Sequence, residues 1–433
     1  MTCSTSSTTS LSKLSLLLAA WRDPVARVMN GDLLAVLIAA MLPWSTSAVA
    51  ILMLLWLLAV VPTLDARAFW RSLSRPVCLL PLALFALAVV GTMWADSPWP
   101  ARVHGINPVV KLLAIPFLMY HFERSQRGAR VFIAFLGSCG LLMVLSWIVW
   151  FVPEMKVTVT ASAGVPIKNY IDQSQEFAVC MVALAPLVIK LFNQGHYGKA
   201  VASAVLALGF FANMAFVVSA RSALVYVPVL LCLFAFIHLS RIASLILFVG
   251  IVMAATTVWF TSSYLRTRIA DISTEYQYYQ QNIPRSTGQR LEYWQKSLKF
   301  FATSPILGNG TGSTRRLFER EAIGQTGLAA EVTGNPHNQT LNVAVQWGIV
   351  GLAGLYGMWL VHLLLFRGDG IANWIGLLVV VQNLVSSLFN SHLFDFHEGW
   401  MYVLGVGIAG GMSLGTRQRA ASKAQVGAST LSQ

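Results

Sequence analysis

The chain has 433 residues, of which 56% are hydrophobic and only 11% are charged, and its formal net charge at pH 7 is +13. Soluble globular domains average about a quarter charged residues, so this composition excludes an ordinary soluble domain and indicates a protein embedded largely in lipid. The basic residues are dispersed among short polar segments, so membrane topology accounts for them better than nucleic-acid binding does.

Long apolar runs recur along the chain, and each approaches the ~20 residues that a helix needs to cross a bilayer. Because lipid offers no partners to backbone polar groups, so many runs predict a bundle of helices. We expect an all-α polytopic membrane protein with about twelve transmembrane helices and one large, partly helical loop. The expected helices are 31–45, 48–64, 79–95, 107–121, 131–152, 175–193, 200–218, 222–239, 243–260, 344–366, 371–388 and 399–415.

The distribution of arginine and lysine predicts the orientation of these helices. Basic residues follow the even-numbered helices, as at Arg67, Arg124 and Arg367, which favours a cytoplasmic location for both ends of the chain. The serine- and threonine-rich start of the chain lacks the order of a signal peptide. The predicted parts are a cytoplasmic N-terminal tail at 1–30, helices one to nine in 31–260, the large loop at 261–343, helices ten to twelve in 344–415, and a cytoplasmic C-terminal tail at 416–433.

The first candidate for chemistry is Arg221, in the run Ser-Ala-Arg-Ser-Ala at 219–223 between the seventh and eighth expected helices. Ionisable side chains at membrane depth are costly, so they are functional by default. The alternative is an arginine at a helix end whose guanidinium reaches up to the water layer.

Within the large loop, Thr287–Thr303 is predicted to be a helix, because Leu291, Trp294, Leu298 and Phe301 fall at helical spacing and Pro305 follows. Arg290 lies one turn before Trp294, and its planar fork suits bidentate capture of phosphate oxygens. The alternative is an arginine on a solvated helix face. The glycines at 308–312 lack the pattern of a phosphate-binding loop, so we expect a structural turn there.

His337 is the only histidine in the polar segment, and it stands between Pro336 and Asn338 where the chain returns to the membrane. An imidazole at that boundary can accept a proton from a hydroxyl group at neutral pH. It could instead only hydrogen-bond a phosphate, or be an interfacial histidine without a chemical role.

Two further groups of residues carry weaker signals. Lys111, near Arg102 at the outer end of the fourth expected helix, is a candidate ancillary site for an anionic group. His392, Asp395, His397 and Glu398 carry metal-ligand side chains but show no recognised ligand spacing, so we expect no metal site. The five cysteines all lie outside the large loop, which argues against a disulfide framework.

At these residues the chain resembles the O-antigen ligase and polymerase superfamily of bacterial envelope proteins. The resemblance rests on the 219–223 turn, on Arg290 and Trp294, on the run from Pro305 to Gly312, on His337 and Asn338, and on Gly348 and Gly351. It implies a metal-independent glycosyltransferase without a cofactor, located in the bacterial inner membrane, whose large loop and active site face the periplasm.

The resemblance also implies the reaction. The donor would be a glycan linked to undecaprenyl pyrophosphate, and the acceptor a sugar hydroxyl of lipid A-core for a ligase, or a second lipid-linked repeat for a polymerase. We expect a ligase, in which Arg221 and Arg290 stabilise the departing phosphate, His337 accepts the proton, and Lys111, Asn338, Trp294 and Arg102 contribute to substrate binding. Membrane lipids are the other expected partners, and nucleic acid is not expected. A transporter or flippase for lipid-linked glycan is the alternative of a different class.

Overall fold

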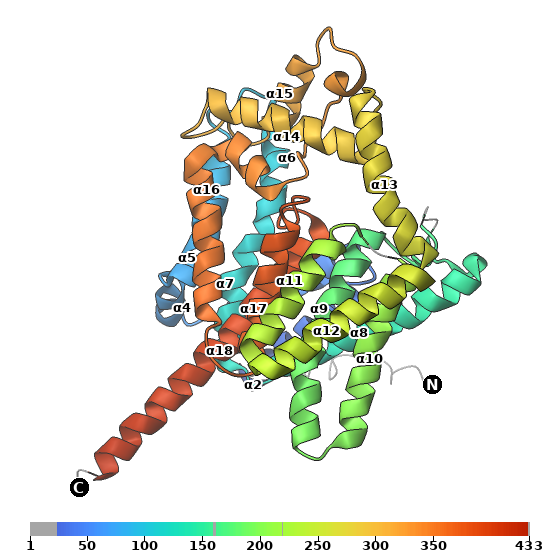
Figure 1. Cartoon of the computed structure of the whole chain (residues 1–433). Coiled ribbons are helices and arrows are strands. Elements are labelled where there is room, and N and C mark those ends of the chain that lie inside the picture. The colour runs from blue at the N-terminus through green and yellow to red at the C-terminus, as the bar shows by residue number, and fades with distance from the viewer. Residues whose placement is uncertain (1–23, 159–161, 219, 432–433) are drawn as a thin grey trace, which may run out of the picture.

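The computed structural model describes residues 24–158, 162–218 and 220–431, in which the regular secondary structure is helical and no strand occurs. Figure 1 shows a bundle of helices with a cap at one end. The helices are α2 (Pro24–Met41), α3 (Thr46–Val60), α4 (Ala66–Leu73), α5 (Pro76–Val90), α6 (Trp99–Val110), α7 (Ala114–Arg124), α8 (Gly128–Phe151), α9 (Tyr170–Asn193), α10 (Tyr197–Phe216), α11 (Ala223–His238), α12 (Arg241–Thr261), α13 (Ser263–Gln280), α14 (Ser286–Thr303), α15 (Thr314–Glu321), α16 (Gln339–Leu365), α17 (Ile371–Ser386) and α18 (Phe396–Leu431), with short 3-10 helices at Val61–Thr63, Lys111–Leu113, Pro153–Met155 and Gly327–Ala330.

The all-helical architecture agrees with the sequence analysis, whereas the number of membrane spans agrees only in part. Among the described residues, seven helices are long and apolar enough to cross a membrane, or eight if the bent pair α4 and α5 counts as one span. Each of the twelve expected stretches overlaps a helix, but α11 and α17 have only 16 residues each. The chain is therefore a multi-pass membrane protein with seven or eight candidate spans.

Several helix ends differ from those expected. The segment Trp99–Arg124 is one candidate span of 26 residues, although the sequence analysis began this helix at 107. Pro100 in the first turn explains the earlier start, because proline is well accommodated there. At the other end of the chain, α18 continues to Leu431 through the expected tail, where alanine, glutamine, arginine and lysine favour helix. Of the expected N-terminal tail, residues 1–23 lie outside the described ranges.

The bundle core is formed by long helix pairs that pack side by side, namely α7 with α18, α9 with α10 and α5 with α16. Small residues permit the closest of these contacts. A Cβ atom added at Gly411 of α18 would lie 2.6 Å from the main-chain oxygen of Met119 on α7. Close backbone approach at glycine is typical of helix packing in membranes, where burial from water contributes little.

The polar segment folds into the cap, which consists of α13, α14 and α15 and lies at the end of the bundle opposite the C-terminal end of α18 (Figure 1). The predicted helix at Thr287–Thr303 is confirmed as α14, but its predicted buried face is wrong. Leu298 is 56% exposed, while Tyr293, Ser297 and Phe300 are buried. The buried residues still form one helical stripe, but it includes the polar residues Lys296 and Ser297, so hydrophobic spacing alone does not identify it. The helix α13 was not predicted.

The expected turn at 308–312 is confirmed, and it locks the cap onto α16. Gly308, Gly310 and Gly312 all have positive φ angles, and Asn309 and Gly310 donate main-chain hydrogen bonds of 2.8 Å to Val345 and Gln346 of α16. The helix is kinked at the same level, because Gly348 has a φ of 60°. A Cβ atom there would lie 2.3 Å from the main-chain oxygen of Ile306. Only glycine therefore fits both the backbone angle and the contact.

We expect Gly348→Ala to lower the stability of the folded protein by about 1–3 kcal/mol, because alanine would be strained at this φ angle and would collide with the backbone of the turn. Thermal unfolding in detergent measures this loss. Gly354→Ala on the same helix is the control, since its nearest atom lies 3.5 Å away at the tip of Leu84. Equal melting temperatures for the two variants would contradict the locking role of Gly348.

Candidate functional site

His337 lies at the junction between the cap and α16. Its φ is 55°, a left-handed conformation that is uncommon for a residue with a side chain. The backbone is held there because the main-chain N–H of His337 donates to Asn335 Oδ1 at 2.9 Å. Asn338 follows as the N-terminal cap of α16 and accepts from the main-chain N–H of Leu341. The turn at His337 and the N-terminal capping by Asn338 together direct the imidazole away from α16 and toward the helices α13 to α15.

The imidazole of His337 has partners on two sides. Its ring is stacked on that of Tyr293 from α14, with 6.2 Å between ring centres and 24° between planes. Its Nδ1 atom lies 2.7 Å from Asn390 Oδ1, in the segment between α17 and α18. Burial lowers the pKa of His337, and the nearby charge of Arg290 lowers it further, while the hydrogen bond to Asn390 opposes this shift in part. The ring is therefore neutral at neutral pH, as a proton acceptor must be.

Arg221 lies in the turn between α10 and α11 and is paired with carboxylates of α13. Its guanidinium forms a fork with Glu275, with N–O distances of 2.8 and 2.6 Å, and Asp271 lies 3.7 Å away. Glu275 also accepts hydrogen bonds from the main-chain N–H and the hydroxyl of Thr287. Although burial opposes ionisation, these bonds lower the pKa of Glu275 to about 2. Ser219, the first residue of the motif around Arg221, lies outside the described residues.

Arg290 is a positive group of the site that is not directly paired with a carboxylate. It is half-buried on α14, and among the described residues it forms no ion pair. Burial lowers its pKa and the charge of Arg221 acts in the same direction, while Tyr170 and the charge of Glu275 act in the opposite direction. Because Arg290 also acts on the pKa of His337, the three residues predicted to be catalytic lie within electrostatic range of one another. Such a site is prepared for an anionic ligand.

A third arginine, which the sequence analysis did not separate from its neighbours, joins this group. Arg268 of α13 lies over the ring of Tyr170, 4.9 Å from its centre, and Tyr170 also influences the pKa of Arg290 and of Arg221. Three guanidinium groups thus lie near Tyr170, and among them Arg221 is paired with the carboxylates Asp271 and Glu275. Nothing in the sequence distinguishes Arg268 from the other arginines of the cap, since the signal is only its place on a helix that was not predicted.

The residues predicted to bind substrate serve mainly to hold segments together in this structure. Arg102 donates to the main-chain oxygens of Ser97 and Thr92, and Lys111 donates to those of Phe394 and Asp395. Asn338 donates to the main-chain oxygen of Leu388 in addition to capping α16. Trp294 packs beside the buried cluster of Tyr293, Phe300, Phe318 and Val345. The ring that touches His337 belongs to the preceding residue, Tyr293.

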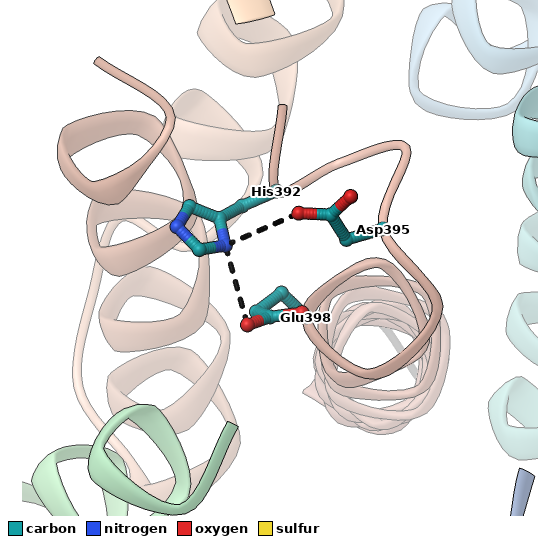
Figure 2. A group of neighbouring side chains, drawn as sticks. All are labelled: His392, Asp395 and Glu398. Carbon is teal, nitrogen blue, oxygen red and sulfur yellow. Dashed lines mark ion pairs between the residues drawn. The ribbon is translucent and has the colours of Figure 1, made fainter. Parts of the chain in front are cut away.

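Behind Asn390 lies a group of three titratable side chains, of which His392 and Glu398 are buried and Asp395 is partly exposed (Figure 2). The Nδ1 atom of His392 is 3.3 Å from Glu398 and 3.8 Å from Asp395. Burial lowers the pKa of His392 to about 4, while burial and the charge of Glu398 raise the pKa of Asp395 to about 7. Their ligand atoms lie within 4.8 Å of one another, a spacing that a divalent cation could bridge. The ammonium group of Lys111 already supplies positive charge there.

An apolar cavity of about 340 Å³ opens beside the arginines, between α10, α11, α12 and α13. Ala223 and Leu224, which follow Arg221 by two and three residues, form part of its wall. Leu265 and Ile269 of α13 form another part. Charged and apolar surfaces therefore meet at the start of α11, as an amphipathic ligand requires. The lining of the cavity includes Phe211, Ala223, Leu224, Ala255, Trp259 and Leu265.

Comparison with known proteins relates one part of the chain to a family. Residues 203–356 match the family model described as O-antigen ligase. The matched segment begins in α10 and ends in α16, so it contains Arg221, Arg290 and His337 but not Asn390. No curated protein matches the chain.

We expect Arg221→Ala to loosen the cap locally, because Glu275 would lose the partner that ties α13 and the start of α14 to the bundle. The pair is partly exposed, so the loss is about 1–2 kcal/mol, and hydrogen exchange in α13 should quicken roughly tenfold. The folded pKa of Glu275 is depressed, so this contribution is present above its usual pKa and is lost as the pH falls through about 2. Glu275 therefore stays ionised between about pH 6 and 8, and its titration should not change the hydrogen-exchange protection of α13 in that range. Arg315→Ala, which removes the exposed pair with Glu319, is the control; equal exchange in both variants would contradict the tie.

Proposed function

We propose that this chain, whose match to the O-antigen ligase family confirms the resemblance seen in its sequence, is an O-antigen ligase. The match indicates a membrane glycosyltransferase of the O-antigen ligase or polymerase type. In the proposed reaction, a glycan passes from undecaprenyl pyrophosphate to a sugar hydroxyl of lipid A-core. The observation that carries the proposal is the half-buried Arg290, not directly paired with a carboxylate among the described residues, between Arg221 and His337.

The arginines suit the departing group of such a transfer. As the glycosidic bond to the donor breaks, positive charge develops on the sugar and negative charge on the leaving phosphate. Fixed guanidinium groups stabilise that negative charge without having to reorganise, and loss of one such group typically costs ~10²–10³ in rate. Arg290 would bind the phosphate directly. Arg221 would do so when the phosphate replaces Glu275 on its fork.

His337 suits the activation of the acceptor. Its neutral ring would accept the proton of the acceptor hydroxyl while the hydroxyl oxygen attacks the anomeric carbon, and the bond from that carbon to the phosphate oxygen would break. Such general-base assistance is worth roughly 10²–10⁴ in rate. Attack from the side opposite the phosphate would invert the anomeric configuration. The donor is already activated by its pyrophosphate, so we propose no cofactor and no metal.

The apolar cavity beside Arg221 suits the lipid part of the donor. A prenyl chain in the cavity of about 340 Å³ would bring its terminal phosphate toward Arg221, because the wall of the cavity begins two residues after that arginine. The cavity would hold only the part of an undecaprenyl chain nearest the phosphate, and the remainder would stay among the membrane lipids. We propose that Lys111, Arg102, Asn338 and Trp294 act on substrate binding through the segments that they hold.

We propose that the cap and its site face the periplasm and that both ends of the chain are cytoplasmic, in the bacterial inner membrane. The excess of arginine and lysine near Arg67, Arg124 and the end of α18 supports this orientation, because positive charge favours the cytoplasmic side. The division into two groups of transmembrane helices, 31–260 and 344–415, on either side of the loop at 261–343 remains part of the proposal, as do the tails at 1–30 and 416–433.

The test is the lipopolysaccharide ladder of a strain that lacks this gene, complemented with the wild type, His337→Ala or Arg290→Ala. For a ligase, both variants should lose all glycan-bearing bands while lipid-linked polymer accumulates, since transfer should fall by ~10²–10³ or more. Arg285→Ala, at an exposed position before α14, is the control and should restore the ladder. Retention of core with one repeat would instead indicate a polymerase, and lipid-linked glycan left on the cytoplasmic face would indicate a flippase.

A second prediction concerns the lipid chain of the donor. Ala255→Phe would fill the cavity, so we expect it to weaken binding of undecaprenyl pyrophosphate about tenfold, by the loss of one to two buried methylene groups, and to leave the binding of inorganic pyrophosphate unchanged. Calorimetry on the purified protein measures both affinities. Ile246→Phe, at an exposed position of the same helix, is the control. Equal affinities for the lipid in the two variants would exclude this cavity as its site.

A further inference from the structure

The hydrogen bonds behind His337 form a directed chain. Asn390 Oδ1 lies 2.7 Å from His337 Nδ1, and Asn390 Nδ2 donates to Asp395 Oδ2 at 2.8 Å. Asn390 thus connects the imidazole to a carboxyl group that itself does not touch the ring. The segment that carries both residues lies between α17 and α18, outside the residues that match the family model.

The direction of this chain determines where His337 carries its proton. The amide NH₂ group of Asn390 faces Asp395 Oδ2, and the ionised form of Asp395 enforces this orientation because a carboxylate only accepts hydrogen bonds. The amide oxygen then faces His337 and also only accepts, so Nδ1 must carry the hydrogen of the neutral ring. The lone pair is left on Nε2, to which no described residue is hydrogen-bonded.

We propose that Asn390 and Asp395 are positioning residues that hold His337 in the tautomer whose Nε2 atom is free to accept the proton of the acceptor hydroxyl. This inference rests on the proposed function, because it assigns the atom at which the general base acts. Without the chain, the neutral ring would divide between two tautomers, and the one with a proton on Nε2 is unable to act as a base there.

Lys111 acts at the far end of the same chain. Its ammonium group donates to the main-chain oxygens of Phe394 and Asp395, so it holds the backbone from which the Asp395 carboxyl group extends. His392 Nδ1 lies 3.8 Å from Oδ2 of that carboxyl group, the same oxygen that accepts from Asn390. The group of Figure 2 therefore supports the position of Asp395, and through Asn390 the orientation of the base.

The charged and titratable groups that face His337 come from two parts of the fold. Arg290 and Tyr293 face it from α14, and His392 and Asp395 lie behind Asn390. Arg290 and burial disfavour the imidazolium, so the ring stays neutral as the pH falls below its ordinary pKa. Activity that needs neutral His337 should decline only at lower pH. A negative charge placed at residue 390 would raise the pKa of His337, because it would stabilise the imidazolium.

The test compares three variants by the pH dependence of glycan transfer in detergent, with undecaprenyl-pyrophosphate-linked glycan and purified lipid A-core as substrates. Asn390→Asp keeps an acceptor beside Nδ1, so we expect its acidic limb to move to higher pH while its rate on the plateau stays within a few-fold of wild type. Asn390→Ala should lose about two- to fivefold on the plateau, because the neutral ring would divide between two tautomers and only one of them has a free lone pair on Nε2. Asp395→Asn should lose rate to a smaller extent, since Asn390 would be free to turn over.

Controls separate the failure of this inference from the failure of the proposed function. Gln281→Glu adds a charge at an exposed position and should leave the pH profile unchanged. Thermal unfolding identifies any variant that is inactive only because it is misfolded. If His337→Gln abolishes transfer while both Asn390 variants keep the wild-type rate and pH profile, the positioning role is overturned and the proposed function stands. If His337→Gln transfers glycan at the wild-type rate, the base assignment fails, and the positioning role with it.

Discussion

The forked ion pair between Arg221 and Glu275 is the interaction on which the site depends. It joins the turn at the start of α11 to α13, and because Glu275 also binds Thr287, it reaches the first turn of α14. Arg290 and Tyr293 are on that helix, so their positions relative to His337 follow from it. One carboxylate thereby relates parts of the chain that are more than fifty residues apart.

The glycine turn at 308–312 also fixes the position of the cap on the bundle, through α16 rather than through α13. Its main-chain bonds to Val345 and Gln346 hold the cap on α16, whose first residues follow His337. The site is thus held between an electrostatic contact at α13 and a backbone contact at α16. Several buried polar atoms of this region have no hydrogen-bond partner, among them Arg221 Nε and Trp294 Nε1. Arg290 is half-buried and forms no ion pair among the described residues, an arrangement that favours an anionic ligand.

Local features of the site could be predicted from the sequence, but its pairings could not. Arg221 was a candidate because a charge between two apolar runs is costly, and His337 because it is the lone imidazole at the end of the polar segment. Arg290 was a candidate because it lies one turn before Trp294 on a predicted helix and a guanidinium group suits phosphate. The helix α14 and the glycine turn have local signals of their own. Glu275, Tyr293 and Asn390 have none, because their importance arises only from partners brought near by folding.

Arg102 and Lys111 show the reverse case, in which residues that the sequence marks as candidates for substrate binding make structural contacts instead. A guanidinium or ammonium group at the end of a helix can bind a phosphate or a main-chain oxygen equally well, and the sequence does not distinguish the two. In the structure both side chains donate to carbonyl oxygens. The buried face of α14 could not be identified from hydrophobic spacing, because it includes the polar residues Lys296 and Ser297.

The position of the apolar cavity has a consequence for how the site is supplied. One of its walls is α12, and only 6% of the apolar window of that helix is buried within the protein. A ligand with a long hydrocarbon chain would therefore enter sideways from the bilayer, without crossing water. Its encounter rate would follow two-dimensional diffusion, and occupancy would depend on the number of ligand molecules per unit area of membrane. Such a site would compete for lipid with every other protein in the same leaflet.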